Sequence, residues 1–253
     1  MKGSVYMERK NAIVLLHGFD HDHRCWTWVM EELHKLDPTL AVYAVDLPGR
    51  GNKKGTTVRT PHEAAAAMMS DIEALGLDRV YLVGHSLAGH TIPLVATLLG
   101  EDRTLGQMYI AASVPPQGKS FFSTLFPRFL SLPIELVCKT NIPMKVPAPM
   151  QDYLWGGPQM TLKQFRRVHK GAIWERIALF GAPVDREGML MKNIVWVRTL
   201  QDRGATQKNQ TKYRENLGVG VECEIPIDAP HDCMISNPKE LAELILDEFY
   251  KTL

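Results

Sequence analysis

A single serine stands among small residues in Gly84-His85-Ser86-Leu87-Ala88. An apolar run, Val80 to Val83, precedes this stretch, and apolar residues at helical spacing follow from Leu87 to Leu99. A tight turn from strand to helix exposes a hydroxyl and requires small neighbours, which is the form of a nucleophile elbow. The simpler alternative is that Ser86 caps the helix at an ordinary turn. A candidate base and a candidate carboxylate elsewhere in the chain would favour the nucleophile over the helix cap.

A serine hydroxyl is a poor nucleophile at neutral pH unless a histidine takes its proton and a carboxylate orients that histidine. Asp202 follows the predicted strand Ile194 to Arg198, and His231 follows the predicted strand Val221 to Pro226. Serine, then aspartate, then histidine, each after a strand, is the chain order of a triad on a parallel sheet. We therefore predict Ser86 as nucleophile, with His231 as base and Asp202 as its orienting carboxylate.

Other carboxylates lie near this histidine in the sequence. Asp228 and Asp232 flank His231, but they are too close along the chain to reach its far ring nitrogen easily. The alternative for Asp202 is a solvated turn carboxylate that pairs with Arg203. Asp202 stays the predicted partner because it alone of these follows a separate strand.

The negative charge that develops on a carbonyl oxygen under attack needs preorganised hydrogen-bond donors. The backbone amide of Leu87 directly follows the serine at a helix start. The amide of Phe19 follows His17-Gly18 at the end of the first predicted strand. We expect these two amides to form an oxyanion hole.

Strands and helices must alternate to bring these residues to one edge of a sheet. Continuous apolar runs closed by turn residues predict buried parallel strands, and helical spacing or a capping box predicts the helices between them. The fold class is therefore α/β, a mostly parallel central sheet with helices on both faces. The strands are expected at residues 12–16, 41–45, 80–83, 107–112, 194–198 and 221–226, and helices at 26–36, 61–75, 87–99 and 238–249.

This alternation stops at Val114-Pro115-Pro116 and resumes near residue 191. The intervening 114–190 are rich in Pro, Met and aromatic residues, with short helical pieces such as Leu162 to Leu179. We predict a helical lid here, inserted between two strands of an α/β core that comprises 1–113 and 191–253. The expected substrate pocket is apolar and lined by His17, Phe122, Trp155 and Trp174, although both tryptophans could instead form the core of the lid.

Composition excludes several classes of protein. The 253 residues carry a net charge of +1, which gives no basic footprint for nucleic acid or an anionic membrane. The most apolar long stretch, Phe121 to Val137, is too interrupted to span a bilayer. Four cysteines without C-x-x-C spacing and an N-terminus without an apolar signal core predict a cytoplasmic protein. No pattern in the sequence predicts the oligomeric state, and a homodimer remains an alternative to a monomer.

Asp20-His21-Asp22-His23 contains residue types that bind zinc. No second His/Asp cluster of recognisable ligand spacing accompanies it in the sequence. We interpret the stretch as a solvated polar loop and expect neither a metal nor another cofactor.

The chain resembles the α/β-hydrolases, and among them the plant methylesterase and hydroxynitrile lyase group with its bacterial relatives. The resemblance is carried by His17-Gly18-Phe19, Asp46-Leu47-Pro48-Gly49-Arg50-Gly51, Val83 to Gly89, Asp202-Arg203 and the stretch from His231 to Leu241. Two departures are Ala88, where a second glycine is usual, and Asp232, where hydroxynitrile lyases carry lysine.

The resemblance and the triad together imply a serine hydrolase that cleaves a carboxylic ester of an apolar small molecule through an acyl-enzyme. A methyl ester or a lactone is the expected substrate. Two alternatives remain: a lyase, cyclase or rearrangement enzyme that uses the same triad, and a ligand-binding receptor.

Overall fold

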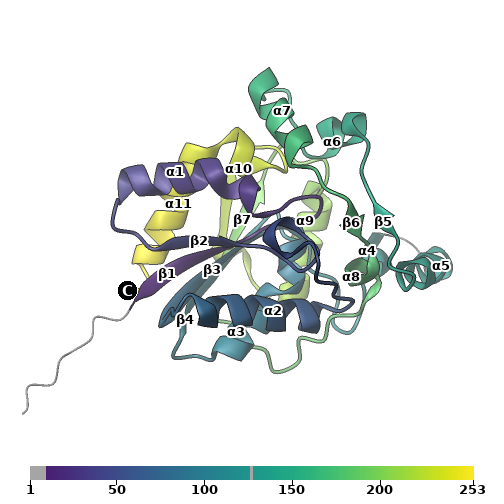
Figure 1. Ribbon diagram of the computed structural model, residues 1–253, viewed down its shortest axis with the longest axis horizontal. Coiled ribbons are helices and arrows are strands. Elements are labelled where there is room, and N and C mark those ends of the chain that lie inside the picture. Colours follow the sequence, from purple (N-terminus) through teal and green to yellow (C-terminus); the bar gives the residue numbers. More distant parts are fainter. Residues whose placement is uncertain (1–9, 126–127) are drawn as a thin grey trace, which may run out of the picture.

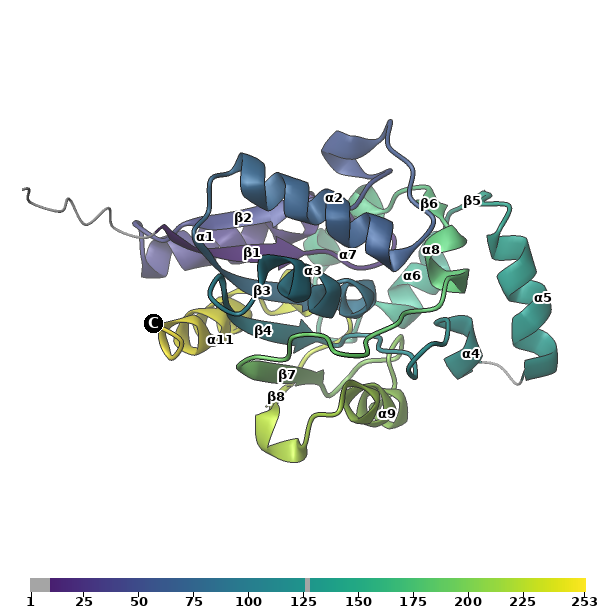
Figure 2. The same cartoon turned by 90° about the horizontal axis from the view of Figure 1, so that it is seen from below.

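The computed structural model describes residues 10–125 and 128–253. Its centre is a six-stranded sheet in the order β2-β1-β3-β4-β7-β8, and every neighbouring pair in it is parallel (Figures 1 and 2). The predicted parallel central sheet is confirmed. The strands are β1 (Asn11–Leu16), β2 (Val42–Val45), β3 (Arg79–His85), β4 (Thr104–Ile110), β7 (Ile194–Thr199) and β8 (Glu224–Ile227).

Alternate residues of β1 enter two separate cores because successive side chains of a strand point to opposite faces. Ala12, Val14 and Leu16 pack with helices α2 (Pro61–Ala74), α3 (Ile92–Leu99) and α9 (Gln207–Leu217). Ile13 and Leu15 pack with α1 (Thr27–Leu36), α10 (Cys233–Ser236) and α11 (Pro238–Tyr250). The apolar strands are thus covered on both sides, as Figure 1 shows for α1 and α11 against α2 and α3.

Several predicted elements differ from the structure at their ends, and the strand expected at 107–112 is β4 (Thr104–Ile110). The helix expected from Leu87 to Leu99 is a 3-10 helix η3 (Ser86–His90) followed by α3, which begins only after Thr91 and carries a proline in its first turn. The strand expected from residue 221 begins at Glu224, because Val221–Cys223 form a 3-10 turn. The capping box of α2 is confirmed, since Thr60 and Glu63 each accept the other's backbone amide.

The segment 114–190, here called the insert, connects β4 to β7 and lies at the carboxyl end of the sheet (Figure 1). The helix expected from Leu162 to Leu179 ends at Gly171, because the backbone at Ala172 is extended (φ −60°, ψ 131°) and leads into a strand. The insert contains α4 (Phe122–Leu125), α5 (Arg128–Cys138), α6 (Ala148–Leu154), α7 (Leu162–Gly171), α8 (Ala178–Gly181) and the antiparallel pair β5 (Pro143–Met144) and β6 (Glu175–Arg176). Across the described residues, no helix combines the length and the apolar composition needed to cross a membrane.

The sheet order places a switch point between β1 and β3. The chain leaves β1 for β2 on one side and then returns to β3 on the other. Open parallel sheets bind ligands beyond the carboxyl ends of the strands at such a point, because the connections there diverge. His17 and Ser86, which follow or lie near the ends of β1 and β3, therefore lie at the expected position for a site.

Candidate active site

Ser86, His231 and Asp202 form one hydrogen-bonded chain. The Ser86 Oγ lies 2.9 Å from Nε2 of His231, and Nδ1 of the same ring lies 2.7 Å from Oδ2 of Asp202. Each residue follows a strand of the central sheet, β3, β8 and β7 respectively. Because parallel strands end at one edge, residues separated by 145 and 29 positions meet there. The three predicted residues are thus brought together in the geometry that a serine nucleophile requires.

Asp202 is held by two further donors. Thr199 Oγ1 donates to its Oδ2 at 2.8 Å, and the amide of Ala205 donates to its Oδ1 at 2.7 Å. The side chain is buried, so the alternative of a solvated turn carboxylate paired with Arg203 is wrong. Asp228 is not the partner of His231, because it lies at the surface and accepts a hydrogen bond from the side-chain amide of Gln201.

The electrostatic surroundings of His231 would suit a general base. Burial opposes protonation of the ring, but the charge and hydrogen bond of Asp202 outweigh burial and raise the pKa of His231 above 6.5. Asp232 adds to this rise through its charge. An imidazolium formed during proton transfer is therefore stabilised where it appears.

The turn at Ser86 is backbone-strained. Ser86 has φ of +52°, a region that residues other than glycine seldom adopt and that is found at functional turns. A Cβ on Gly84 would lie 2.3 Å from Cδ1 of Ile92 and 2.8 Å from Cβ of Ala88, so glycine is required there. The absence of a side chain at Gly84 lets β3 pack closely against the start of α3, and Ser86 lies at the apex of the turn between them.

The loop after β1, residues 17–20, approaches Ser86 closely. A Cβ on Gly18 would lie 2.8 Å from Cβ of Ser86, so only glycine permits this approach. His17 Nε2 accepts the amide of Leu47 at 3.1 Å, and its protonated Nδ1 donates to the carbonyl of Gly18 at 2.9 Å. In a trans peptide the amide of Phe19 then points away from His17. Burial, followed by the charge of Arg50, lowers the pKa of His17 to about 3, so this ring stays neutral.

A cavity of about 330 Å³ opens over Ser86 and His231. Both predicted oxyanion residues line it, and so do the predicted pocket residues Phe122 and Trp155. The rest of the wall is almost wholly apolar and comes from the core and the insert alike: Ala111, Ser113, Phe121, Met144, Val146, Leu154, Ile177, Phe180, Gly204, Ala205 and Tyr213.

Two predicted pocket residues lie elsewhere. His17 is fully buried and directed at Gly18 and Leu47, because both ring nitrogens satisfy backbone groups of the β1 and β2 loops. Trp174 is 66% exposed, because α7 ends at Gly171 and the following segment turns this ring outward while its neighbour Glu175 turns inward. Both predictions for the pocket wall are wrong.

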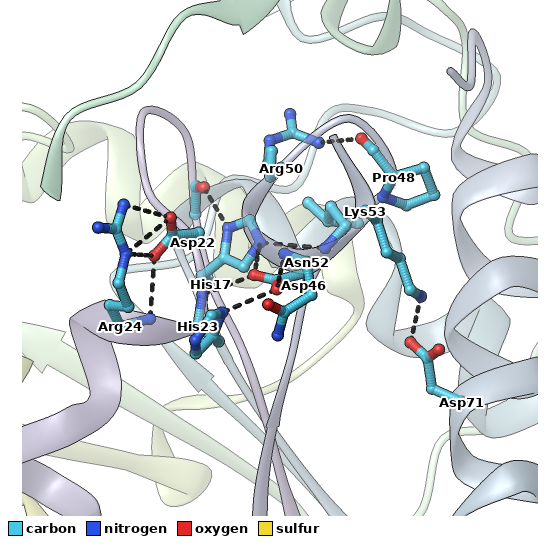
Figure 3. Close-up of polar contacts among 12 residues, drawn as sticks. His17, Asp22, His23, Arg24, Asp46, Pro48, Arg50, Asn52, Lys53 and Asp71 are labelled. Atoms are coloured by element: carbon cyan, nitrogen blue, oxygen red, sulfur yellow. Dashed lines mark hydrogen bonds and ion pairs between the residues drawn. The ribbon is translucent and has the colours of Figure 1, made fainter. Parts of the chain in front are cut away.

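The loop Asp20-His21-Asp22-His23 is not solvated as predicted: the side chains of Asp20, His21 and Asp22 are buried. Asp22, His23 and Asp46 lie close enough together to surround a metal ion. Their oxygens already accept protein donors, however. Asp22 accepts from Arg24 through both oxygens, and Asp46 accepts the amide and Nδ1 of His23, each at 2.8 Å (Figure 3). These contacts explain the cluster as the fastening of two loops.

Sequence reasoning missed a buried pair beside the triad. His21 Nε2 lies 3.1 Å from Oδ1 of Asp232, and the amide of Asp232 donates to the carbonyl of Trp155 at 3.1 Å. His85 lies next to this pair and donates from Nε2 to the carbonyl of His231 at 2.9 Å. The sequence signals were Asp232, an acidic residue directly after the predicted base, and His21 in the stretch interpreted as a solvated loop.

Comparisons with known proteins extend over almost the whole chain. A rice protein, the probable esterase PIR7A of Oryza sativa, is 23% identical over 250 residues, which cover 92% of this chain and 94% of that protein. An extracellular alpha/beta-hydrolase from a Paenibacillus species, described as sharing structural and functional homology with tobacco salicylic acid binding protein 2, superposes with a TM-score of 0.78 at 23% identity, covering 94% and 98% of the two chains.

The methylesterase MES16 of Arabidopsis superposes with a TM-score of 0.71 at 18% identity, covering 96% of this chain and 99% of that one. The expected resemblance to the plant methylesterase group is thereby confirmed. A model of the alpha/beta hydrolase family matches residues 13–244, and the chain therefore belongs to the alpha/beta hydrolase family.

Proposed function

We propose that the protein is a serine carboxylesterase that hydrolyses an ester of an apolar small molecule through an acyl-enzyme. A methyl ester or a lactone is the proposed substrate. The observation that carries the proposal is the hydrogen-bonded chain from Ser86 through His231 to Asp202, which opens into an apolar cavity of about 330 Å³. The rice relative's name, probable esterase, supports the same reaction class.

In the first half-reaction, Ser86 Oγ attacks the ester carbonyl carbon while Nε2 of His231 takes the hydroxyl proton. Asp202 holds Nδ1 of the ring and stabilises the imidazolium. The C–O bond to the alcohol then breaks, and the alcohol leaves with the proton that His231 returns. In the second half-reaction, water gives a proton to His231 and attacks the acyl carbon. The bond between that carbon and Ser86 Oγ then breaks, His231 returns the proton to Oγ, and the acid is released.

The amides of Phe19 and Leu87 are the proposed donors to the oxyanion formed in both steps. Leu87 lies at the start of η3, directly after the serine. Phe19 follows Gly18, whose missing side chain lets the loop approach Ser86. Preorganised amides of this kind contribute about 10²–10³ in rate for each donor.

The cavity favours neutral, apolar substrates. Its walls carry no lysine, arginine, aspartate or glutamate among the described residues. A charged carboxylate product would lose solvation without a compensating cation, so the product acid is expected to leave readily. We propose that the insert acts as the lid, since Phe121, Met144, Val146, Trp155 and Phe180 come from it.

A fluorophosphonate probe tests the nucleophile. We expect covalent labelling of Ser86 in the unaltered protein, no labelling of Ser86→Ala, and full labelling of Ser70→Ala, an exposed serine on α2. A panel of p-nitrophenyl esters, aromatic methyl esters and lactones of graded size then defines the substrate. A Ser86→Ala protein that keeps full turnover would instead favour lyase or cyclase chemistry. Tight ligand binding with negligible turnover would favour a receptor.

A further inference from the structure

Asp20 directly follows Phe19 and joins the loop after β1 to the insert. Its Oδ2 accepts the side-chain amide of Gln151 on α6 at 3.0 Å, and its Oδ1 accepts the amide of Ile173 at 3.2 Å. Its own amide donates to Oε2 of Glu175 on β6 at 3.1 Å. Three residues of the insert thus form hydrogen bonds with Asp20.

Glu175 is itself fixed to the core. Arg50, in the loop after β2, donates from Nε to Oε2 of Glu175 at 3.0 Å and from a second nitrogen to Oε1. The side chains of Asp20, Glu175, Arg50 and Gln151 are all at least 96% buried. A forked pair of this kind fixes both distance and orientation, so the Glu175 carboxylate is a rigid acceptor for the Asp20 amide.

These contacts control the peptide units on both sides of Phe19. The Gly18 carbonyl is held by His17, and the Asp20 amide is held by Glu175. Asp20 also has φ of +62°, which the surrounding hydrogen bonds must maintain. His17 of the core and Glu175 of the insert thus hold the two peptide units that flank Phe19.

We propose that Asp20 is a positioning residue that couples docking of the insert to alignment of the Phe19 amide in the oxyanion hole. The proposal rests on the proposed esterase function. Asp20 does not line the cavity, so it would act on the rate of acyl transfer rather than on the binding of an apolar substrate. Few enzymes can tolerate even a small displacement of an oxyanion donor, because the donor must meet a charge that exists only in the transition state.

The charges around Asp20 give the coupling a pH dependence. Glu175 faces it from β6, Lys145 from the segment after β5 and His21 from its own loop, while the charge of Arg50 is engaged by Glu175. Burial, which outweighs the charge of His21, raises the pKa of Asp20 to about 7. A carboxyl exposed by undocking would ionise near its ordinary pKa of 3.8. Docking is therefore tighter when Asp20 is neutral, and it weakens as pH rises from about 4 to 7.

The test compares Asp20→Ala and Asp20→Asn with a control, Asp102→Ala, at an exposed turn between α3 and β4. Alanine leaves the donors of Gln151 and Ile173 without their acceptor. Asparagine keeps an acceptor for the amide of Ile173. Its NH2 group can donate to Oε1 of Gln151, which has no hydrogen-bond partner in the described structure, once the Gln151 amide rotates and gives up its bond to Val146. A neutral carboxyl can pair in the same way. Activity on the best p-nitrophenyl ester is measured together with amide hydrogen exchange over residues 144–177, corrected for the intrinsic effect of pH.

For Asp20→Ala we expect kcat to fall about 10–100-fold with less than a threefold change in KM, and faster exchange at Ile173. Asp20→Asn should recover kcat to within about threefold of the unaltered protein at pH 6. Its exchange should not change between pH 6 and 8, whereas protection in the unaltered protein should decline over that range. Asp102→Ala should match the unaltered protein throughout.

A folded Asp20→Ala protein with unaltered kcat would overturn the positioning role. Unaltered exchange over the insert would overturn the fastening role, and equal impairment of the Asn and Ala variants would contradict the importance of the neutral form. If Ser86 of the unaltered protein fails to react with a fluorophosphonate, the proposed function fails and the positioning role fails with it. The exchange measurement would still decide whether Asp20 fastens the insert.

Discussion

Nδ1 of His231 lies 2.7 Å from Oδ2 of Asp202, and both side chains are almost wholly withdrawn from water. The hydrogen bond fixes the proton on Nδ1 and leaves Nε2 free to accept from Ser86. Loss of the carboxylate charge would favour the wrong tautomer even if the side chain kept its place.

Asp202→Asn is therefore expected to lower kcat about 10⁴-fold. The matched control is Asp228→Asn, which removes a nearby carboxylate that contacts only Gln201 in the described structure. The control should retain activity within about twofold of the unaltered protein. Steady-state kinetics on one ester, with circular dichroism to verify folding, decides the matter; equal effects of the two substitutions would count against the assignment.

The acid limb of the pH–rate profile should lie above pH 6.5. Only neutral His231 can accept the serine proton, and its pKa is raised by Asp202 against the effect of burial. Activity should thus fall as pH decreases through this raised pKa. The profile of kcat/KM is best measured in the Asp20→Asn variant, because the Asp20 carboxyl would otherwise titrate in the same pH range. A limb well below pH 6.5 would contradict the proposed electrostatics.

Gly18→Ala should lower kcat at least 100-fold while the protein stays folded. The added Cβ would meet Cβ of Ser86 at 2.8 Å and Nδ1 of His85 at 3.0 Å, so the loop that carries the Phe19 amide must retreat. Gly55→Ala is the control, since nothing lies within 4 Å of a Cβ there. Comparable activity of the two variants would show that the close approach is unimportant for catalysis.

Asp20→Asn should raise Tm at pH 8 by a few degrees relative to the unaltered protein. The folded-state pKa of Asp20 is about 7 against 3.8 for an exposed carboxyl, so the folded state binds more protons over that window. The stability contributed by this group therefore falls as pH rises from about 4 to 7 and is lowest above 7. Asparagine removes the penalty, and each kcal/mol corresponds to about 2–4 °C in a chain of this size.

Thermal melts at pH 5.5 and 8 test this sign. The advantage of Asp20→Asn should shrink at pH 5.5, where the native carboxyl is mostly neutral. An advantage that is the same at both values, or a lower Tm at pH 8, would exclude the titration of Asp20 as its cause.

The central sheet and the triad were predictable because each depends on short local patterns. Buried parallel strands are continuous apolar runs, and Ser86, Asp202 and His231 each follow one of them. Parallel strands end at the same edge, so position after a strand was enough to predict proximity. The 3-10 helix after Ser86 and the late start of β8 shifted element ends without moving these residues.

The path of the chain through the insert could not be predicted from the sequence, and the reason is physical. Its direction at each turn depends on contacts with distant residues, such as Glu175 with Arg50, and these leave no periodic pattern in the sequence. Trp174 and Glu175 are neighbours, yet one faces solvent and the other is buried. His17 was predicted to line the pocket, but its ring nitrogens bind the backbone groups of Gly18 and Leu47. Side-chain direction in irregular segments was thus the part that local pattern could not supply.

The ion pair between Arg50 and Glu175 has a consequence for protein engineering. Cap segments are attractive units to exchange between related enzymes when a new specificity is wanted. If the insert of this chain were replaced by a cap without equivalents of Gln151 and Glu175, Arg50 and Asp20 of the core would lose their hydrogen-bond partners. A successful chimera must carry all four residues together or replace all four.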